Sequence, residues 1–198
     1  SSVSFSVTAT GDGLSYQWRR GTTPLTDGGA ISGATSPTLT INPVLPSDAA
    51  TNYNVVISGI APCEPVTSSN AALVVNEAVV ITSQPMATQT VCSGTDVTLS
   101  VSATGTGLSY QWRRGTVILT NGGNVSGASS TLTLTGVTTA DQGTYTVVVN
   151  GASPCPSETS DPAELIVHQA VAITAQPAPT QPACSGSLVS FSVTATGD

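Results

Sequence analysis

The sequence predicts an all-β chain of tandem antiparallel β-sandwiches, each with about seven strands in Greek-key order. Three observations lead to this prediction. The sequence repeats itself, with an offset of 94 residues from Trp18 to Trp112 and of 92 from Cys63 to Cys155. Apolar side chains alternate with polar ones at period two, and turn residues rich in Gly, Pro, Asn and Ser recur between the alternating segments. A period of this length is too long for a solenoid unit and suits one small domain per repeat.

The repeat is clearest around the two tryptophans. The octapeptide LSYQWRRG stands at residues 14–21 and again at residues 108–115. A third copy begins later, because SVSFSVTATGD at residues 2–12 returns as LVSFSVTATGD at residues 188–198. We interpret the sequence as a window on a longer tandem array. We expect it to divide into residues 1–76, a repeat lacking its first strand, residues 77–168, a complete repeat, and residues 169–198, the first two strands of a third.

The strands of the complete repeat follow from its alternation. Residues 97–103 alternate apolar side chains with Ser and Thr, as in a strand with one buried face. Strands of the same kind are expected at residues 108–112, 132–134 and 145–149, and a last one at residues 165–167. Helical periodicity is absent. Each core is expected to depend on its single tryptophan, since truncating such a side chain to alanine costs about 3–5 kcal/mol.

Composition excludes several classes of function. Only 8% of the residues are charged, the net charge is −7, and no lysine occurs. Nucleic-acid binding requires clustered Lys and Arg, so no nucleic-acid partner is expected. No apolar run approaches the roughly 20 residues of a transmembrane helix, so no membrane insertion is expected. Solubility is instead expected to come from 26 Ser and 31 Thr, many of them on the exposed strand faces.

Residues 97–149 resemble an immunoglobulin-like domain. The segments that carry the resemblance are VTLSV, the tryptophan of YQWRRG, TLTLTGV and DQGTYTV. The resemblance implies a buried tryptophan on the third strand and a corner tyrosine on the sixth. Where the family has its inter-sheet disulfide, this sequence has valines, so apolar packing is expected to replace that bond. The core residues implied are Trp18, Tyr53, Val7 and Val55 in the first copy, and Trp112, Tyr145, Val101 and Val147 in the second.

More narrowly, the chain resembles the tandem immunoglobulin-like repeats of giant secreted adhesins and filament proteins of gliding, type IX-secreting Bacteroidota. The shared motifs are I-T-x-Q-P, C-S-G, S-V-T-A-T-G and Y-Q-W-R-R-G, and together they cover all three copies. The resemblance implies an extracellular location on a bacterial cell surface. Such repeats often serve as spacers, so the resemblance says less about what the chain binds.

Four cysteines at the repeat period favour an oxidising, extracellular setting. In the immunoglobulin topology Cys92 falls in the turn after the first strand and Cys155 in the loop after the sixth. These positions are at opposite ends of a sandwich, roughly 24 Å apart along a strand, whereas a disulfide requires Cα atoms within about 7 Å. We expect disulfides between consecutive repeats, with an intradomain Cys92–Cys155 bond as the alternative. The cysteines assigned to such bonds are Cys63, Cys92, Cys155 and Cys184.

The basic residues form one arginine pair in each copy, at positions 19–20 and 113–114. Arg113 has the opposite strand parity to the tryptophan before it and is expected to face solvent. Arg114 lies on the tryptophan's face, and we expect it to form a structural ion pair with Asp141. The alternative is a site for sulfated or acidic glycans around Arg19 and Arg113. The matching ion pair expected in the first copy joins Arg20 to Asp48.

Nothing in the sequence indicates catalysis. His168 is the only histidine, and no nearby serine and carboxylate complete a triad with it. Cysteine and histidine do not cluster at metal-ligand spacing. Calcium at a junction between repeats is an open alternative, although no D-x-D-x-D spacing supports it. We therefore expect no enzyme, no cofactor and no catalytic or metal site.

The resulting prediction is a structural or adhesive repeat segment of a very long extracellular surface protein, which forms a stalk, an adhesin or a multi-chain filament. Its partners would be the neighbouring repeats and copies of itself in a homo-oligomeric fibre. Low charge leaves sheet edges poorly protected against lateral association, which motivates the filament. The alternative is a module that binds a cell-surface glycan or protein through its loops. That alternative predicts exposed aromatic residues in loops, whereas the tryptophans and tyrosines fall in predicted strands.

Overall fold

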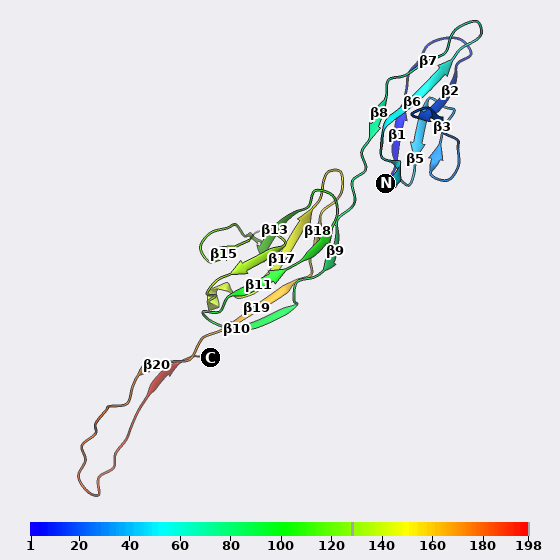
Figure 1. Ribbon diagram of the computed structural model, residues 1–198. Coiled ribbons are helices and arrows are strands. Elements are labelled where there is room, and N and C mark those ends of the chain that lie inside the picture. Colours follow the sequence, from blue (N-terminus) through cyan, green and yellow to red (C-terminus); the bar gives the residue numbers. More distant parts are fainter. Residues whose placement is uncertain (128, 198) are drawn as a thin grey trace. The chain divides into compact units, whose positions relative to one another are not determined.

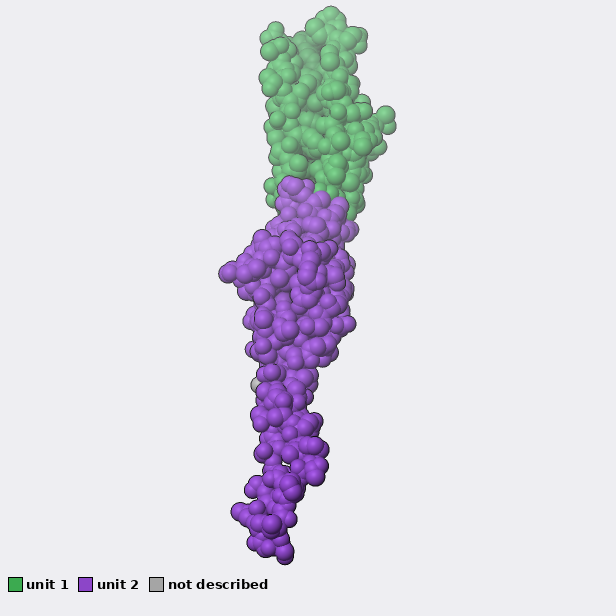
Figure 2. All heavy atoms as spheres, turned by 90° about the vertical axis from the view of Figure 1, so that its left-hand side faces the viewer, with its two compact units in different colours: residues 1–76 green, residues 77–198 purple. Residues whose placement is uncertain are grey.

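The computed structural model of the protein describes residues 1–127 and 129–197. The chain forms two compact units, Ser1–Asn76 and Glu77–Asp198, which Figure 2 distinguishes by colour. Ala128 and Asp198, which fall in the predicted second and third copies, lie outside the described residues. Among the described residues, helical structure is limited to one 3-10 turn in each unit, η1 at Pro46–Asp48 and η2 at Thr139–Asp141.

The first unit is a sandwich of two antiparallel sheets (Figure 1). One sheet has the order β1-β5-β4. The other has the order β3-β2-β6-β7, and β8 also pairs with β6. The strands are β1 (Val3–Ser6), β2 (Ser15–Arg20), β3 (Thr23–Pro24), β4 (Ile31–Ser32), β5 (Thr38–Ile41), β6 (Ala50–Ser58), β7 (Val66–Thr67) and β8 (Ala71–Leu73).

The second unit repeats this plan and adds two strands before it. One sheet has the order β11-β16-β15, and the other has the order β10-β19-β17-β13-β14 with β18 on β17. The strands are β9 (Val80–Ser83), β10 (Thr88–Cys92), β11 (Val97–Ser100), β12 (Ser102–Thr104), β13 (Ser109–Arg114), β14 (Val117–Ile118), β15 (Val125–Ser126), β16 (Thr131–Leu134), β17 (Gly143–Asn150), β18 (Glu158–Thr159) and β19 (Ala163–His168).

The two added strands belong to different sheets. β9 pairs with β12, and β10 then pairs with β19. Pro85 stands between them and has no amide hydrogen to donate, so the ladder of β9 ends there and the chain crosses over. The β10–β19 pair is parallel, whereas the other strand pairs of the described residues are antiparallel. The prediction of all-β antiparallel sandwiches is confirmed.

The alternating apolar side chains of the strands form the cores. In the second unit a buried cluster is built from both sheets and centres on Trp112. The predicted strand at residues 97–103 is interrupted at Val101. The backbone N–H of Val101 donates to the carbonyl oxygen of Ser130 at 2.9 Å. Val101 nevertheless keeps its inward parity and is buried. The interruption therefore divides the strand into β11 and β12 without moving its apolar face.

Residues 169–197 form a long hairpin that follows the second sandwich (Figure 1). Its short ladder joins β20 (Ala172–Ala175) to β21 (Thr194–Thr196). Every residue from His168 to Gly197 is exposed. The hairpin therefore has strand pairing but no second sheet packed against it.

Candidate functional site

The tryptophan environment is the most closely repeated feature of the two sandwiches. Trp112 on β13 is fully buried, and its indole Nε1–H donates to the carbonyl oxygen of Ser129 at 2.8 Å. Trp18 on β2 donates in the same way to Ser36 at 2.9 Å. These bonds satisfy the one polar atom of each indole, so the ring is buried without an unpaired donor.

The valines at the inter-sheet cysteine positions also lie in the cores. Val101 and Val147 belong to the buried cluster around Trp112. In the first unit Val55 is buried, whereas Val7 is only half-buried and packs at the margin of its cluster. The two units therefore share the same apolar positions, but the first unit covers them less completely.

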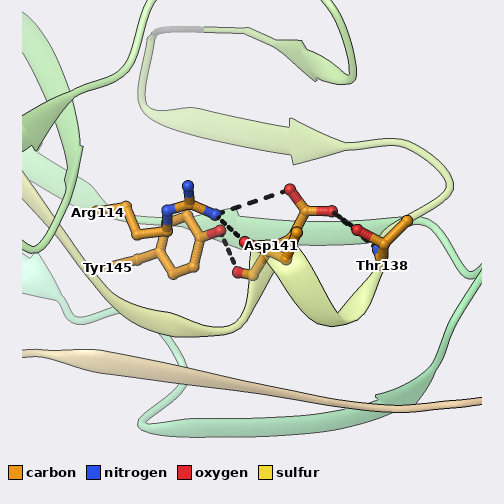
Figure 3. Close-up of polar contacts among 5 residues, drawn as sticks. Arg114, Thr138, Asp141 and Tyr145 are labelled. Atoms are coloured by element: carbon orange, nitrogen blue, oxygen red, sulfur yellow. Dashed lines mark hydrogen bonds and ion pairs between the residues drawn. The ribbon is translucent and has the colours of Figure 1, made fainter.

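Arg114, Asp141 and Tyr145 form a polar cluster at one end of the second sandwich (Figure 3). The hydroxyl of Tyr145 on β17 donates to the carbonyl oxygen of Asp141 at 2.6 Å. Arg114 Nη1 lies 3.8 Å from the Asp141 carboxylate and donates to the carbonyl oxygen of Ala140 at 2.7 Å. Arg114 therefore holds η2 chiefly through the backbone, with the ion pair as a longer, secondary contact.

The carboxylate of Asp141 also accepts hydrogen bonds from Thr138, from the backbone N–H at 2.8 Å and from the hydroxyl at 3.0 Å. Burial acts to raise the pKa of Asp141. The bonds from Thr138, a bond from the side chain of Asn124 and the positive charge of Arg114 act against it, and the net pKa lies below the ordinary value. Burial raises the pKa of Tyr145, so its hydroxyl stays protonated and can donate at neutral pH.

The first unit builds this corner differently. The hydroxyl of Tyr53 donates to the carbonyl oxygen of Asp48 at 2.7 Å, as Tyr145 does to Asp141. Arg20, however, donates to the carbonyl oxygen of Ser47 at 3.1 Å, and the described residues hold no ion pair between Arg20 and Asp48. The Asp48 carboxylate instead accepts from the backbone N–H of Leu45 at 2.8 Å. The ion pair predicted there is thus replaced by two bonds to backbone groups.

Arg19 and Arg113 do not project freely into solvent, contrary to the expectation for Arg113. Both side chains are half-buried, and the Nε atom of each is buried without a hydrogen-bond partner among the described residues. Arg113 lies opposite Thr146 on one neighbouring strand and Ile118 on the other. Long charged side chains commonly bury their aliphatic stem against such neighbours and keep the charged head in water. A glycan site at this position would have only the outer part of the guanidinium group available.

Cys92 and Cys155 lie at opposite ends of the second sandwich. Cys92 is the last residue of β10 and is exposed beside His168, the last residue of β19. Cys155 follows β17 at the other end, where a β-carbon placed on Gly151 would lie 3.9 Å from its Cβ. Within the described residues Cys92 forms no disulfide, so the structure contains no Cys92–Cys155 bond. Cys63 and Cys184 are likewise exposed and without a disulfide.

The first unit contains an apolar groove that the sequence analysis missed. Its volume is about 850 Å³, and two segments line it, residues 7–14 after β1 and residues 57–68 from the end of β6 onward. Most of the lining atoms are apolar, and Asp12 and Glu64 supply the charged groups. In the second unit, β9 pairs with β12 at the equivalent position of the repeat.

The described part of the chain has neither a metal-binding cluster nor a membrane-spanning helix. No group of three or more His, Cys, Asp or Glu residues is placed to hold a metal ion. Across residues 1–127 and 129–197, no helix is long and apolar enough to cross a membrane.

Comparisons with known proteins agree with the sandwich architecture. Residues 80–150 match the family model described as immunoglobulin domain. A three-domain structure of titin (an E-to-A mutated variant) is 18% identical with a TM-score of 0.72, and the match covers 98% of this chain and 70% of that one. The insect immune protein hemolin is 19% identical with a TM-score of 0.53, covering 78% of this chain and 39% of hemolin. No curated protein matches the chain.

These likenesses establish the fold: the chain consists of tandem immunoglobulin-like β-sandwiches. At such low identity they carry no residue roles from one protein to another. The chain also spans well under half the length of hemolin.

Proposed function

We propose that the chain is a structural and adhesive segment of a very long extracellular surface protein, in which each repeat adds one sandwich to a stalk or filament. The observation that carries the proposal is the repetition itself. Trp18 and Trp112, with their backbone acceptors and their corner tyrosines, occupy the same places in two sandwiches. Near-identical repeats with separate cores suit a structural protein that has to span a distance.

The surface supports this proposal. The chain has 31 threonines and only 15 charged residues (4 basic and 11 acidic). Threonine is favoured on the exposed face of a strand and keeps that face soluble. Because the surface has so few charges, it offers little electrostatic repulsion against contact with a neighbouring copy. Adhesive or lateral contacts between chains are therefore part of the proposal.

The proposed source is a gliding bacterium of the Bacteroidota, with export by type IX secretion to the cell surface. Its support is the set of motifs I-T-x-Q-P, C-S-G and Y-Q-W-R-R-G, which recur at the repeat period. The proposed division of the chain into a first, a complete and a partial third copy rests on the same repetition.

The cysteines extend the proposal to an oxidising exterior. Cys92 and Cys155 lie at opposite ends of one sandwich, separated by the eight residues of β17, or roughly 26 Å of strand. Bonds between consecutive repeats, from the end of a β10-type strand to the loop after a β17-type strand, would stiffen the array. Mass spectrometry of peptides from the native, unreduced protein tests this pairing. A Cys92–Cys155 peptide pair would contradict it.

Negative-stain electron microscopy of the full-length protein tests the proposed function. A thin stalk one sandwich wide supports a single-chain spacer, and a thicker fibre supports assembly of several chains. A compact particle would contradict both. A glycan array tests the alternative of a binding module, and for that alternative a variant with Arg113→Gln and Arg19→Gln should lose the bound glycan.

A further inference from the structure

We propose that the open edge of β14 in the second unit pairs with β14 of a second copy of this chain, so that one sheet runs through both copies. The proposal rests on the lateral contacts that are part of the proposed function, and it names the strand that makes them. Three observations carry it: the outward-pointing backbone of Ile118, the proline at its position in the first unit, and the self-complementary sequence around it.

β14 is the last strand of its sheet. It pairs with β13, with Arg113 opposite Ile118, and among the described residues no strand pairs with its other side. Both residues of β14 are exposed although both are apolar, Val117 to 59% and Ile118 to 53%. The edge therefore offers apolar surface together with backbone groups that have no strand beside them.

The hydrogen bonds of β13 fix which backbone groups of β14 point outward. Gly115, which follows β13, donates its N–H to the carbonyl oxygen of Thr144 on the β17 side at 2.8 Å. Leu119 donates its N–H to the carbonyl oxygen of Trp112 at 2.9 Å. Odd-numbered residues of β13 therefore bond toward β17 and even-numbered ones toward β14, since backbone groups alternate in direction along a strand. Ile118 lies opposite an odd-numbered residue, so its N–H and its carbonyl oxygen point away from β13.

The first unit closes this edge with a proline. The repeat places Pro24 at the position of Ile118, with an offset of 94 residues. The pairing of Arg19 with Pro24 on β3 repeats that of Arg113 with Ile118. Proline has no N–H, so the outward donor that Ile118 offers is absent from the first unit. Because a proline on an edge strand protects it against pairing with another chain, the first unit is closed at this edge and the second is open.

The sequence of the open edge is its own complement. Residues 116–120 read Thr-Val-Ile-Leu-Thr, a pattern that is nearly the same in reverse, whereas residues 22–26 read Thr-Thr-Pro-Leu-Thr. Antiparallel pairing about a two-fold axis would place Ile118 opposite Ile118 of the other copy. The same register would place Val117 opposite Leu119, and one threonine opposite another at each end. An edge that complements itself in this way selects a second copy of the chain as its partner.

Such pairing joins apolar groups on both faces of the sheet. The two Ile118 side chains meet on the face that carries Arg113, because directly opposed residues share a face. On the other face Val117 meets Leu119, which already packs against the core of its own unit. Each Ile118 N–H gains the carbonyl oxygen of the other Ile118 as its acceptor, which forms a closed pair of hydrogen bonds. The contact therefore removes apolar surface from water and extends the hydrogen-bonded ladder.

Charge does not oppose this contact. No charged side chain occurs between Arg114 and Asp141, so the segment that forms the edge is neutral. Arg113 lies one strand inward, opposite Ile118. In the pair, the two β14 strands would separate the two Arg113 residues by three strand spacings, roughly 14 Å. This separation exceeds the screening length of about 10 Å at an ionic strength of about 0.1 M.

Disulfide trapping tests the register. In a background with the four native cysteines changed to serine, the chain carrying Ile118→Cys is oxidised. Opposed residues of a hydrogen-bonded antiparallel pair have Cα atoms about 5.5 Å apart, within the range that a disulfide spans. We expect a covalent dimer on a non-reducing gel. Thr116→Cys is the control, because this residue is also exposed but would lie four residues, roughly 13 Å along the strand, from its counterpart in the other copy.

Sedimentation across a concentration range tests the energetics, and the first unit supplies the variant. Ile118→Pro gives the second unit the residue that the first unit carries at this position, so the sandwich should stay folded with a similar melting temperature. We expect the native chain to dimerise at concentrations up to about 1 mM, and Ile118→Pro to weaken dimerisation at least about tenfold. Ile118→Val, which keeps the N–H and the apolar side chain, should retain it. A monomer over this whole range, or equal dimerisation of the native chain and Ile118→Pro, would overturn the proposal.

The trapping result is separate from the microscopy of the full-length protein. A stalk or fibre in which the Ile118 and Thr116 cysteines are trapped equally would leave the proposed function in place and overturn the pairing of β14. Selective trapping through Ile118 in a protein that forms a compact particle would support the pairing and contradict the proposed function.

Discussion

The hydroxyl of Tyr145 donates to the carbonyl oxygen of Asp141 at 2.6 Å, across the junction between η2 and β17. Tyr53 makes the same bond to Asp48, although one more residue separates the partners in the first unit. The bond therefore forms despite the extra residue in the first unit. In both units the tyrosine hydroxyl bonds to the last residue of the preceding 3-10 turn. It holds the start of a central core strand in place.

Removal of this hydroxyl should destabilise the second unit. We expect Tyr145→Phe to lower its free energy of unfolding by about 1–3 kcal/mol, because the partly buried carbonyl oxygen of Asp141 loses its hydrogen-bond donor. Urea unfolding followed by Trp112 fluorescence in a Trp18→Phe background measures the change. Tyr110→Phe is the matched control, since no hydrogen bond of its hydroxyl is seen among the described residues. Equal effects of the two variants would contradict the role of the corner.

The arginines at the ends of β2 and β13 should differ in what they stabilise. Arg114→Gln removes the 2.7 Å bond to Ala140 and the longer contact with Asp141. We expect a cost of about 0.5–1.5 kcal/mol, limited by the partial solvent exposure of the pair. Arg20→Gln removes one longer bond and should cost less. Thermal unfolding of each variant measures this difference, and a larger loss for Arg20→Gln would be inconsistent with it.

Much of the core followed from period-two alternation and from the repeat. Trp112 and Val147 face inward because they lie on the parity that the alternation assigns to the core. The half-burial of Arg113 did not follow, because it depends on neighbours across the sheet, Thr146 and Ile118, whose register the sequence does not state. The Arg20–Asp48 pair failed for a similar reason. A carboxylate in a turn can satisfy the backbone locally, and the choice depends on ångström-scale geometry.

The groove could not be seen as a groove in the sequence. The repeat places residues 7–10 and 101–104 at equivalent positions, but it does not show how the segments around them pack. The structure adds the walls, contributed by residues 7–14 and 57–68. Only the packing of two sheets brings these segments together, because about 45 residues separate them along the chain.

Acid should weaken the second unit through Asp141. Its pKa in the folded state lies below the ordinary value, so the stabilisation is fully present above the unfolded pKa of about 3.9 and is lost as the pH falls through the folded pKa. We expect Asp141→Asn to be less stable than the native chain at neutral pH, with the difference shrinking below pH about 4. Chemical denaturation at a series of pH values measures this.

A second variant tests how far the Thr138 hydroxyl contributes to the lowered pKa of Asp141. Thr138→Val removes the hydroxyl donor at 3.0 Å and keeps the backbone donor at 2.8 Å. The pKa of Asp141, followed by NMR titration, should rise in this variant without reaching that of an unfolded chain. An unchanged pKa would show that the hydroxyl contributes nothing to the carboxylate.

The valines at the inter-sheet positions should accept a disulfide. Val101, between β11 and β12, and Val147, on β17, belong to one buried cluster, and the immunoglobulin-like fold has its cysteine pair at these positions. In a background with the native cysteines changed to serine, Val101→Cys with Val147→Cys should form a bond that closes a loop of 46 residues (147 minus 101). Constraint of the unfolded chain should then stabilise the second unit by about 2–4 kcal/mol.

Thermal unfolding of this double variant with and without a reducing agent measures the gain within one sequence. In the reduced state the two thiols fill less space than the valines and should lower the melting temperature slightly. Oxidation should raise it above that of the serine background. The single variant Val147→Cys, which cannot form the bond, should not respond to the reducing agent. A double variant that stays reduced under oxidising conditions would show that the two sheets hold these positions too far apart for a bond of about 2 Å between sulfur atoms.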